Sequence, residues 1–341
     1  MDKYYKFDAN LRDRIIKLRE EISSVEQIKG LSKNLKAIER DLTLFHAEII
    51  SEVLKDFKDE IDLVGFHGQT IFHKPDSNVS LQLGDGKLLS QLIKKIVVNN
   101  FRKNDLDNGG QGAPLVPIFH KLISKNISKE FKIGYPLNII NIGGITNITQ
   151  ISYNENIKAF DLGPGNCLID EWIRKNSNKM FDKSGLIGRS GKVDDLIFNQ
   201  AVDNFSCFSI DRSLDVKDFD ISFAKGLSLE DGCATITKFS AYLIAEALQK
   251  LDKKKNDSKI LNILCGGGRK NNFLIENIKD FFSNKEIEFK NIDDFKLNGD
   301  FIESQAFAYL AIRSYLKLPI SFPDTTRCKF PISGGEINKN F

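Results

Sequence analysis

Apolar residues in the first third of the chain recur at helical spacing and then at strand spacing. Apolar stripes three to four positions apart predict amphipathic helices over residues 11–22 and about 42–57. The short apolar segments IDLVGF (61–66) and NVSLQL (78–83) predict strands, and each runs into a loop that contains glycine. Helices covering a sheet are therefore expected in this part of the molecule.

The middle of the chain shows a different order. Closely spaced apolar segments at 138–144, 147–151 and 157–160 predict a β-meander, and the helical pattern of LIDEWIRK (168–175) follows directly. A strand cluster that feeds a helix is expected here.

The last third returns to alternating helices and strands. A long helix is predicted over about 231–251, an apolar strand within 259–268 and a final helix over about 303–316. Strand clusters with intervening helices favour an α/β fold in two lobes. We place the domains at residues 1–130 and 131–341, with the C-terminal helix packing back toward the first lobe.

Composition narrows the class of protein. The 49 Lys and Arg residues nearly cancel 46 Asp and Glu, and the one run of like charge, Lys253–Lys255, has the composition of a solvated loop, so nucleic acid is not an expected partner. The five cysteines contain no CxxC pair, and the four histidines lack HxxxH and HExxH spacing, which disfavours disulfide frameworks and zinc sites. No apolar stretch reaches the length of a membrane span. A cytoplasmic protein without a membrane partner is expected.

Glycine-containing loops are the candidate sites. A backbone without a Cβ can approach a phosphate or a sugar closely, and bare N–H groups bind anions. None of these loops matches the GxxxxGK[ST] or GxGxxG pattern, and each by itself could be only a tight turn. They are VGFHGQT (64–70), NGGQGAPLVP (108–117), NIGGITN (141–147) and CGGGRKNN (265–272).

Asp161 is the candidate catalytic carboxylate. It follows the apolar segment IKAF and precedes a Gly-Pro-Gly turn, which predicts a position at the carboxyl end of a strand, where active-site residues of α/β folds collect. There it could take a proton from water or a hydroxyl, although it could also cap the next helix. Glu303, in the first turn of the last helix, could act in a site or complement the helix dipole.

Read together, the loops resemble one family. The motifs that carry the resemblance span roughly residues 60–315 and are GFHGQTIFHKP, LQLGDG, NNFRKNDLDNGGQGAPLVPIFH, NIINIGGITNIT, FDLGPGNCLIDEWI, FDKSGLIGRSGKV, DGCATIT, LCGGGRKNNFLI and ESQAFAYLAIR. In this order they resemble the anhydro-N-acetylmuramic acid kinases of the actin, sugar kinase and Hsp70 superfamily. The resemblance implies a two-lobe actin-like ATPase (ribonuclease H-like) fold with a central cleft.

The resemblance also implies a reaction. ATP with Mg²⁺ would phosphorylate 1,6-anhydro-N-acetylmuramic acid while water opens its ring, giving N-acetylmuramic acid 6-phosphate in the recycling of cell-wall peptidoglycan. Asp161 would be the general base for the water. No protein ligand to the metal is assigned, and a homodimer is possible. The alternatives are a kinase for another amino sugar or a hexose, or an inactive sugar-binding paralogue.

Further residue roles are implied only by the resemblance. The expected sugar contacts are His67, Gln69, Thr70, Arg102 and Glu303. The expected nucleotide-binding residues are Gly143, Gly144 and Asn147 in a phosphate loop and Gly266, Gly267 and Gly268 in an adenosine-binding turn.

One family motif is missing from the sequence. The family normally opens with a strand and an SGTSxDGxD loop that holds the ATP phosphates, and the segment YYKFDANLRDRII resembles the stretch that follows this loop. A start codon placed too far downstream, a fragment and a degenerate paralogue are the three explanations, of which we favour the first. The chain beginning at Met1 is therefore expected to bind ATP poorly until the upstream segment is restored.

Overall fold

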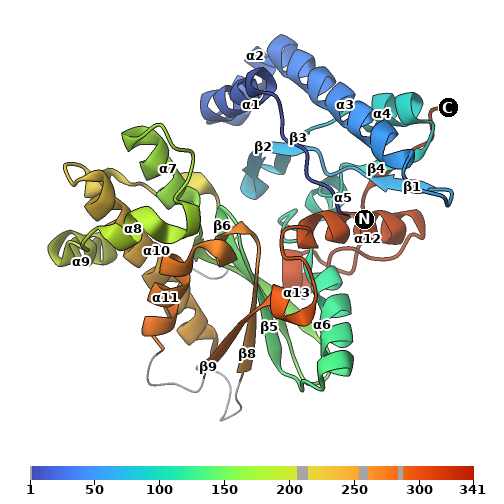
Figure 1. Ribbon diagram of the computed structural model, residues 1–341. Coiled ribbons are helices and arrows are strands. Elements are labelled where there is room, and N and C mark those ends of the chain that lie inside the picture. Colours follow the sequence, from blue (N-terminus) through green and yellow to red (C-terminus); the bar gives the residue numbers. More distant parts are fainter. Residues whose placement is uncertain (1, 206–213, 253–259, 283–286) are drawn as a thin grey trace. The chain divides into compact units, whose positions relative to one another are not determined.

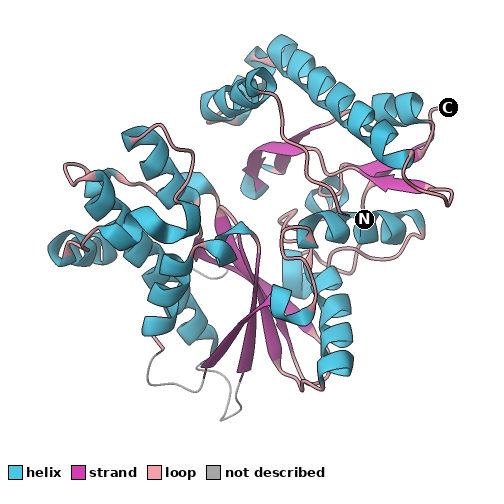
Figure 2. Ribbon diagram, in the orientation of Figure 1, coloured by secondary structure: helices cyan, strands magenta, loops and turns pink. Residues whose placement is uncertain are grey.

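The computed structural model describes residues 2–205, 214–252, 260–282 and 287–341 (Figure 1). Cys207 and Lys253–Lys255 lie outside the described residues. Helices and strands are mixed throughout, which confirms the predicted α/β class (Figure 2). Within the described part of the chain, no helix combines the length and apolar character that crossing a bilayer requires.

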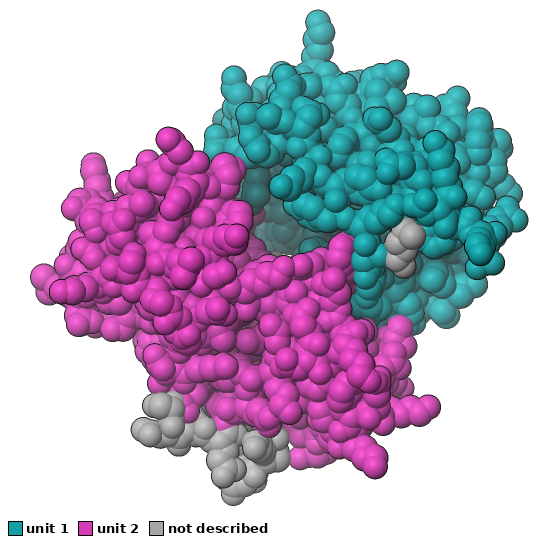
Figure 3. All heavy atoms as spheres, viewed as in Figure 1, with its two compact units in different colours: residues 1–119, 303–341 teal, residues 120–302 magenta. Residues whose placement is uncertain are grey.

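The chain forms two compact units (Figure 3). Unit 1 comprises residues 1–119 and 303–341, and unit 2 comprises residues 120–302. These bounds differ from the domains expected from the sequence at two places. Residues 120–130 belong to the second unit, and residues 303–341 belong to the first.

Unit 1 contains a small three-stranded sheet, a hairpin and the helices that cover them. Strand β1 pairs in parallel with β4, which pairs antiparallel with β10, and β2 and β3 form the antiparallel hairpin. The elements are α1 (Ala9–Glu21), α2 (Val25–Gly30), α3 (Ser32–Leu54), β1 (Leu63–Gly65), β2 (Gln69–Lys74), β3 (Val79–Leu83), α4 (Gly86–Ile93), β4 (Ile96–Asn99), α5 (Lys103–Asp107), α12 (Ile302–Tyr315), α13 (Pro323–Thr326) and β10 (Glu336–Asn338).

Successive residues of β4 face opposite layers of unit 1, as strand geometry requires. Val97 packs with Leu89 of α4 and Ala47 of α3, whereas Val98 packs with Leu310 of α12. The first predicted helical stripe supplies a further cluster in which α1 and α3 cover the β2–β3 hairpin. The helix predicted over 42–57 begins earlier, at Ser32.

Unit 2 is built on a five-stranded sheet of order β7-β6-β5-β8-β9. Only β6 runs antiparallel to its neighbours, and this order with one reversed strand is that of a ribonuclease H-like domain. The elements are α6 (Pro117–Phe131), β5 (Leu137–Ile142), β6 (Ile145–Ile151), β7 (Ile157–Pro164), α7 (Cys167–Asn176), α8 (Leu186–Ser190), α9 (Asp195–Asn204), α10 (Leu229–Asp252), β8 (Ile260–Cys265), α11 (Asn272–Asp280) and β9 (Ile287–Asn291).

The core of unit 2 lies between this sheet and its helices. Helices α7 and α10 cover one face and α6 lies on the other (Figure 1). Strand β8 is buried at every position, which is typical of a central strand with both faces covered. The cysteines at 167, 233, 265 and 328 are free, buried thiols, three of them in this unit.

Two local expectations were wrong. Gln69 and Thr70 belong to strand β2 rather than to a loop, because the turn ends two residues earlier than expected, at Gly68 with its positive φ. Asp161 lies inside β7 rather than after it, because pairing with β6 extends that strand from the predicted residue 160 to Pro164.

Candidate active site

The candidate residues divide cleanly between the two units. All of the expected sugar contacts belong to unit 1, and Asp161 and all of the expected nucleotide-binding residues belong to unit 2. Each group is described below within its own unit.

The two glycine loops of unit 2 lie side by side. Strands β5 and β8 are parallel neighbours, with Asn141 paired to Cys265, so both strands end at the same edge of the sheet. The β5–β6 turn carries Gly143 and Gly144, and the turn after β8 begins at Gly266. Ligands of α/β folds collect at this edge. The topology therefore joins the two expected nucleotide-binding loops into one surface.

The turn at Gly143 and Gly144 is fixed from behind. The Gly144 carbonyl accepts from the N–H of Gly165 at 2.8 Å, and the Gly143 carbonyl accepts from the N–H of Asn166 at 2.8 Å. Gly165 must be a glycine, because a Cβ there would overlap the Gly143 carbonyl oxygen. The hairpin is thus seated on the turn that leads into α7.

The glycines of unit 2 fall into two kinds. Gly266 has φ +79°, and a Cβ on it would lie 2.7 Å from the Ile142 carbonyl oxygen. A Cβ on Gly268 would overlap the Ile142 side chain. Packing therefore explains both.

At the other kind of glycine in unit 2, the space that a side chain would occupy is open. A Cβ on Gly267 would meet nothing within 4 Å, and those on Gly143 and Gly144 would make only contacts at 3.4 and 3.9 Å. The protein itself does not require glycine at these three positions. They form a cradle that side chains would fill, which fits a nucleotide lying against the backbone.

Arg269 braces the second loop. Its side chain is buried; Nη1 donates to the Gly266 carbonyl at 2.9 Å and to Asp300 Oδ1 at 2.7 Å, and Nε donates to Asp293 Oδ2 at 2.6 Å. Its hydrogen bonds lower the pKa of Asp293, whereas the pKa of Asp300 is lowered first by the hydrogen bond from Lys270 and then by that from Arg269. The turn is held by charge-assisted bonds, which are stronger than neutral ones.

Asp161 lies opposite Asn147 in the sheet. The two are paired residues of β7 and β6, and the register shifts between Thr146 and Asn147, which leaves Leu162 as the extra residue of a bulge. Bulges re-aim side chains and are frequent beside active sites. Asp161 is half-buried, and its Oδ2 accepts from the Leu214 N–H at 2.8 Å. Two predicted site residues on consecutive strands are thus neighbours.

In unit 1 the predicted residues His67 and Thr70 are joined by Gln82. Gln82 Nε2 lies 2.9 Å from His67 Nε2 and 3.3 Å from Thr70 Oγ1. His67 Nδ1 lies 2.9 Å from the Gly68 carbonyl oxygen. A cavity of about 350 Å³ is lined by His67 and Gln82 together with residues 83–87 and parts of β4 and β10. Burial and the nearby Arg102 charge lower the pKa of His67 to about 3, so its ring is neutral at pH 7.

The other expected sugar contacts surround this group less directly. Gln69 Nε2 lies 3.4 Å from the carbonyl oxygen of Thr70. Arg102 Nη1 donates to the Gly112 carbonyl at 3.0 Å, which ties it to the glycine loop at 108–113. Glu303 is exposed in the first turn of α12, as predicted, and one turn later the Phe307 ring lies 4.1 Å from the His67 ring.

Three residues of the candidate site were not assigned from sequence. Gln82 lies in the motif LQLGDG, and its alternation with Leu81 and Leu83 already places it on the opposite face of the strand from these leucines. Asp105 is 1% exposed, accepts from the Gly112 N–H at 2.6 Å and thereby fixes the glycine loop, but its other partner, the Thr326 hydroxyl, is 221 residues away in sequence. Arg269 is unremarkable in sequence, because its acidic partners are 24 and 31 residues away.

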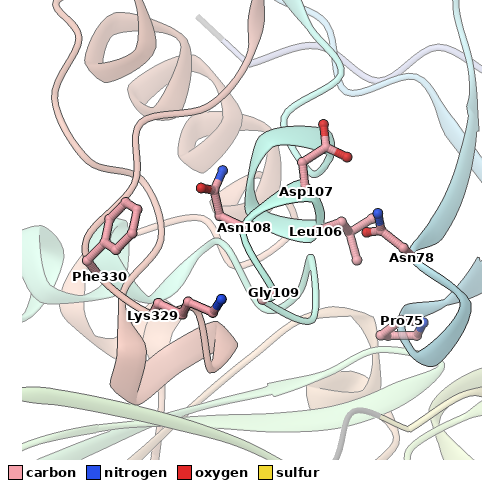
Figure 4. A pocket seen from close by; sticks show the side chains of 9 residues that line it. Pro75, Asn78, Leu106, Asp107, Asn108, Gly109, Lys329 and Phe330 are labelled. Carbon is pink, nitrogen blue, oxygen red and sulfur yellow. The ribbon is translucent and has the colours of Figure 1, made fainter.

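A second cavity of unit 1, of about 480 Å³, is lined by other residues (Figure 4). Lys329 and Phe330 come from the C-terminal segment, Leu106 to Gly110 from the end of α5 and the loop after it, and Pro75 and Asn78 from the β2–β3 connection. None of the predicted site residues lines it.

The described residues contain no group of three or more His, Cys, Asp and Glu side chains placed to hold a metal ion.

Asp170, one turn into α7, is half-buried; its pKa is raised to about 6, mainly by burial.

Comparisons with known proteins identify the chain's relatives. The family model described as anhydro-N-acetylmuramic acid kinase matches residues 2–340. A protein of that name from Pelagibacter ubique is 49% identical over 100% of this chain and 90% of its own length. Those from Zymomonas mobilis and Agrobacterium fabrum are 40% and 35% identical over 88% and 98% of this chain, and 80% and 89% of their own lengths. The chain belongs to the anhydro-N-acetylmuramic acid kinase family.

Proposed function

We propose that this chain uses ATP to convert 1,6-anhydro-N-acetylmuramic acid to N-acetylmuramic acid 6-phosphate, as a step of peptidoglycan recycling. The observation that carries the proposal is the placement of Asp161. In a chain of this family, it lies opposite Asn147 at a bulge of the sheet whose edge also presents the open glycines. The proposed base and the proposed nucleotide cradle thereby share one sheet, which supports their acting together.

Asp161 is the proposed general base. Its carboxylate takes a proton from water as the water oxygen attacks the anomeric carbon, and the bond from that carbon to O6 breaks. The freed O6 then accepts the γ-phosphoryl group, and ADP leaves. The hydrogen bond from the Leu214 N–H holds the carboxylate in one orientation while it acts.

The open glycines Gly143, Gly144 and Gly267 are proposed to face the nucleotide, with Asn147 beside them. Phosphoryl transfer depends on positioning and on neutralising charge, so backbone N–H groups and a rigid turn suit it. ATP is proposed to arrive with Mg²⁺, which neutralises phosphate charge. Gly266 and Gly268 shape the turn through their own packing, and Arg269 braces it.

The polar residues around His67 are proposed to recognise the sugar. Thr70, Gln69, Arg102 and Glu303 supply neutral, cationic and anionic groups, which suits a substrate that carries hydroxyl, acetamido and carboxylate groups. Unit 1 then sets the sugar specificity and unit 2 the chemistry of transfer.

The test is turnover of the bicyclic sugar with ATP and Mg²⁺, followed by mass spectrometry. The expected product carries the mass of one added water and one phosphoryl group. Phosphorylation of a hexose or another amino sugar at an intact 6-hydroxyl, without water uptake, would instead support the rival kinase. Sugar binding without ADP formation, in a chain extended at its N-terminus as well as in this one, would support an inactive paralogue.

The Asp161→Asn variant tests the catalytic assignment. Losing a general base typically costs about 10²–10⁴-fold in rate, so we expect kcat to fall by that factor while the sugar Kd changes less than about threefold. Asn can still accept from Leu214. The matched control is Asp194→Asn, because Asp194 also accepts a backbone N–H, that of Ile197, at 3.0 Å at the start of α9. A normal kcat in Asp161→Asn would remove this residue from the mechanism.

A further inference from the structure

The β2–β3 hairpin has one apolar and one polar face. Ile71 and Leu83 are buried in the cluster that packs against α1 and α3, with Leu81 beside them. Gln82 alternates with these leucines and pairs directly with Thr70 across the hairpin. Side chains of directly paired residues lie on the same face within contact distance. The pairing of Thr70 with Gln82 therefore follows from the backbone register.

The hydrogen bonds of His67 have a fixed direction. Its Nδ1 lies 2.9 Å from the Gly68 carbonyl oxygen, which can only accept, so Nδ1 carries the proton. The ring is neutral at pH 7, since its pKa is about 3, and its Nε2 is therefore an acceptor. The group of Gln82 at 2.9 Å from Nε2 must be the amide NH₂. Reversing the amide would place two acceptors in contact.

The orientation of the Gln82 amide also determines whether Thr70 donates or accepts. The same NH₂ group lies 3.3 Å from Thr70 Oγ1, so the threonine oxygen accepts. The Thr70 hydroxyl proton then has no acceptor among the residues that the structure describes. The amide oxygen of Gln82 is buried without a partner there as well, a cost that native proteins seldom accept away from functional sites.

The same bonds leave His67 no hydrogen-bonding atom for a ligand. One ring nitrogen is used by Gly68 and the other by Gln82. Phe307 packs on the ring at a centroid distance of 4.1 Å and restrains its tilt. His67 is thus a fixed link in the chain of hydrogen bonds.

We propose that His67 and Gln82 are positioning residues that set Thr70 as a hydrogen-bond donor to an oxygen of the sugar that only accepts. Such an oxygen is an ether, a carbonyl or a carboxylate. The inference rests on the proposed function and deepens it. It adds Gln82 to the sugar site and specifies that Thr70 donates the hydrogen bond and the sugar oxygen accepts it.

The kinetic test compares three variants. Thr70→Val keeps the shape and removes the hydroxyl, and a lost hydrogen bond of this kind corresponds to about a 3- to 100-fold fall in kcat/KM for the sugar. Thr70→Ser should stay within about threefold. Gln82→Glu has nearly the same shape but offers only acceptors, so it should draw the Thr70 proton to itself and lower kcat/KM as Thr70→Val does. Thermal unfolding shows whether each variant is folded.

A double variant separates positioning from general disruption. If Gln82 acts through Thr70, Thr70→Val/Gln82→Glu should be no less active than Gln82→Glu alone. Losses that multiply would overturn the inference, and so would an unchanged kcat/KM in Thr70→Val.

An activity-independent readout is the tautomer of His67, measured by ¹⁵N NMR of histidine-labelled protein at pH 7. We expect a neutral ring protonated at Nδ1, and protonation at Nε2 would overturn the inference whatever the activity. A wild-type chain with the expected tautomer that leaves the bicyclic sugar unchanged would refute the proposed function instead, and with it the identity of the acceptor as that sugar.

Discussion

The open and the packed glycines of the β8 turn make a matched pair for mutation. Gly267→Ala adds a methyl group to an exposed position where nothing lies within 4 Å, and its backbone does not need a positive φ. Such a change reduces the freedom of the unfolded chain and stabilises a protein by about 0.4–1 kcal/mol. The folded state should therefore tolerate the substitution.

Gly268→Ala adds the same methyl group one residue later, where it overlaps the Ile142 side chain and lies 2.9 Å from Asn166 Nδ2. Overpacking of this kind costs about 1–3 kcal/mol. At about 2–4 °C per kcal/mol for a domain of this size, the melting temperature should fall by about 2–12 °C.

Gly267→Ala, which should leave the fold intact, is the variant that should weaken nucleotide binding directly. If ATP lies against Gly267, the added methyl group overpacks the complex by about 1–3 kcal/mol, which corresponds to about a 5- to 150-fold higher Kd for ATP. The assay is isothermal titration of ATP with Mg²⁺, run on this chain and on one extended at its N-terminus, beside a thermal melt of each variant. Gly267→Ala with an unchanged melting temperature and an unchanged ATP Kd would show that the open glycines do not face the nucleotide.

Three further predictions concern the side chains that brace the loops. Arg269→Met should lower the stability of unit 2 by about 1–3 kcal/mol by urea unfolding, because a buried charge-assisted network is lost while its carboxylates stay partly in water. Arg269 lowers the pKa of Asp293 and, after Lys270, that of Asp300, so its stabilisation is present above the ordinary aspartate pKa of about 3.9 and is lost as the pH falls below it; the stability of the variant should therefore fall less steeply in acid than that of the wild type. Asp105→Asn replaces one accepting oxygen by a donor beside the Gly112 N–H or the Thr326 hydroxyl and should cost about 1–3 kcal/mol in the same assay.

Each of these predictions has a result that contradicts it. An Arg269→Met chain with wild-type stability at pH 7 would mean that the guanidinium does not brace the Gly266 turn. An unchanged acid limb of the stability curve would remove the linkage to Asp293 and Asp300. For Asp105, the control is Asp107→Asn, whose exposed carboxylate pairs with Lys103 at the surface and should have little effect.

Much of the fold was predictable because local patterns agree with it. The apolar alternation of 138–151 and the run at 260–265 are sufficient to predict strands, and the stripe at 11–22 predicts α1 within two residues at each end. Strand ends were less predictable: the pairing of β7 with β6 continues through Asp161, and Gln69 and Thr70 pair with β3. A strand is extended by its partner, which local residues do not reveal.

The amino-acid sequence by itself determined the α/β class, the glycine loops and the motifs by which the chain resembles its family, since these depend on residue type, period and order. Only the tertiary structure decided which residues meet. It paired Asp161 with Asn147, linked Thr70 to His67 through Gln82, and separated the packed Gly268 from the open Gly267. Register and packing between segments distant in sequence fix these contacts, because a one-residue shift of a strand would turn every side chain to the other face.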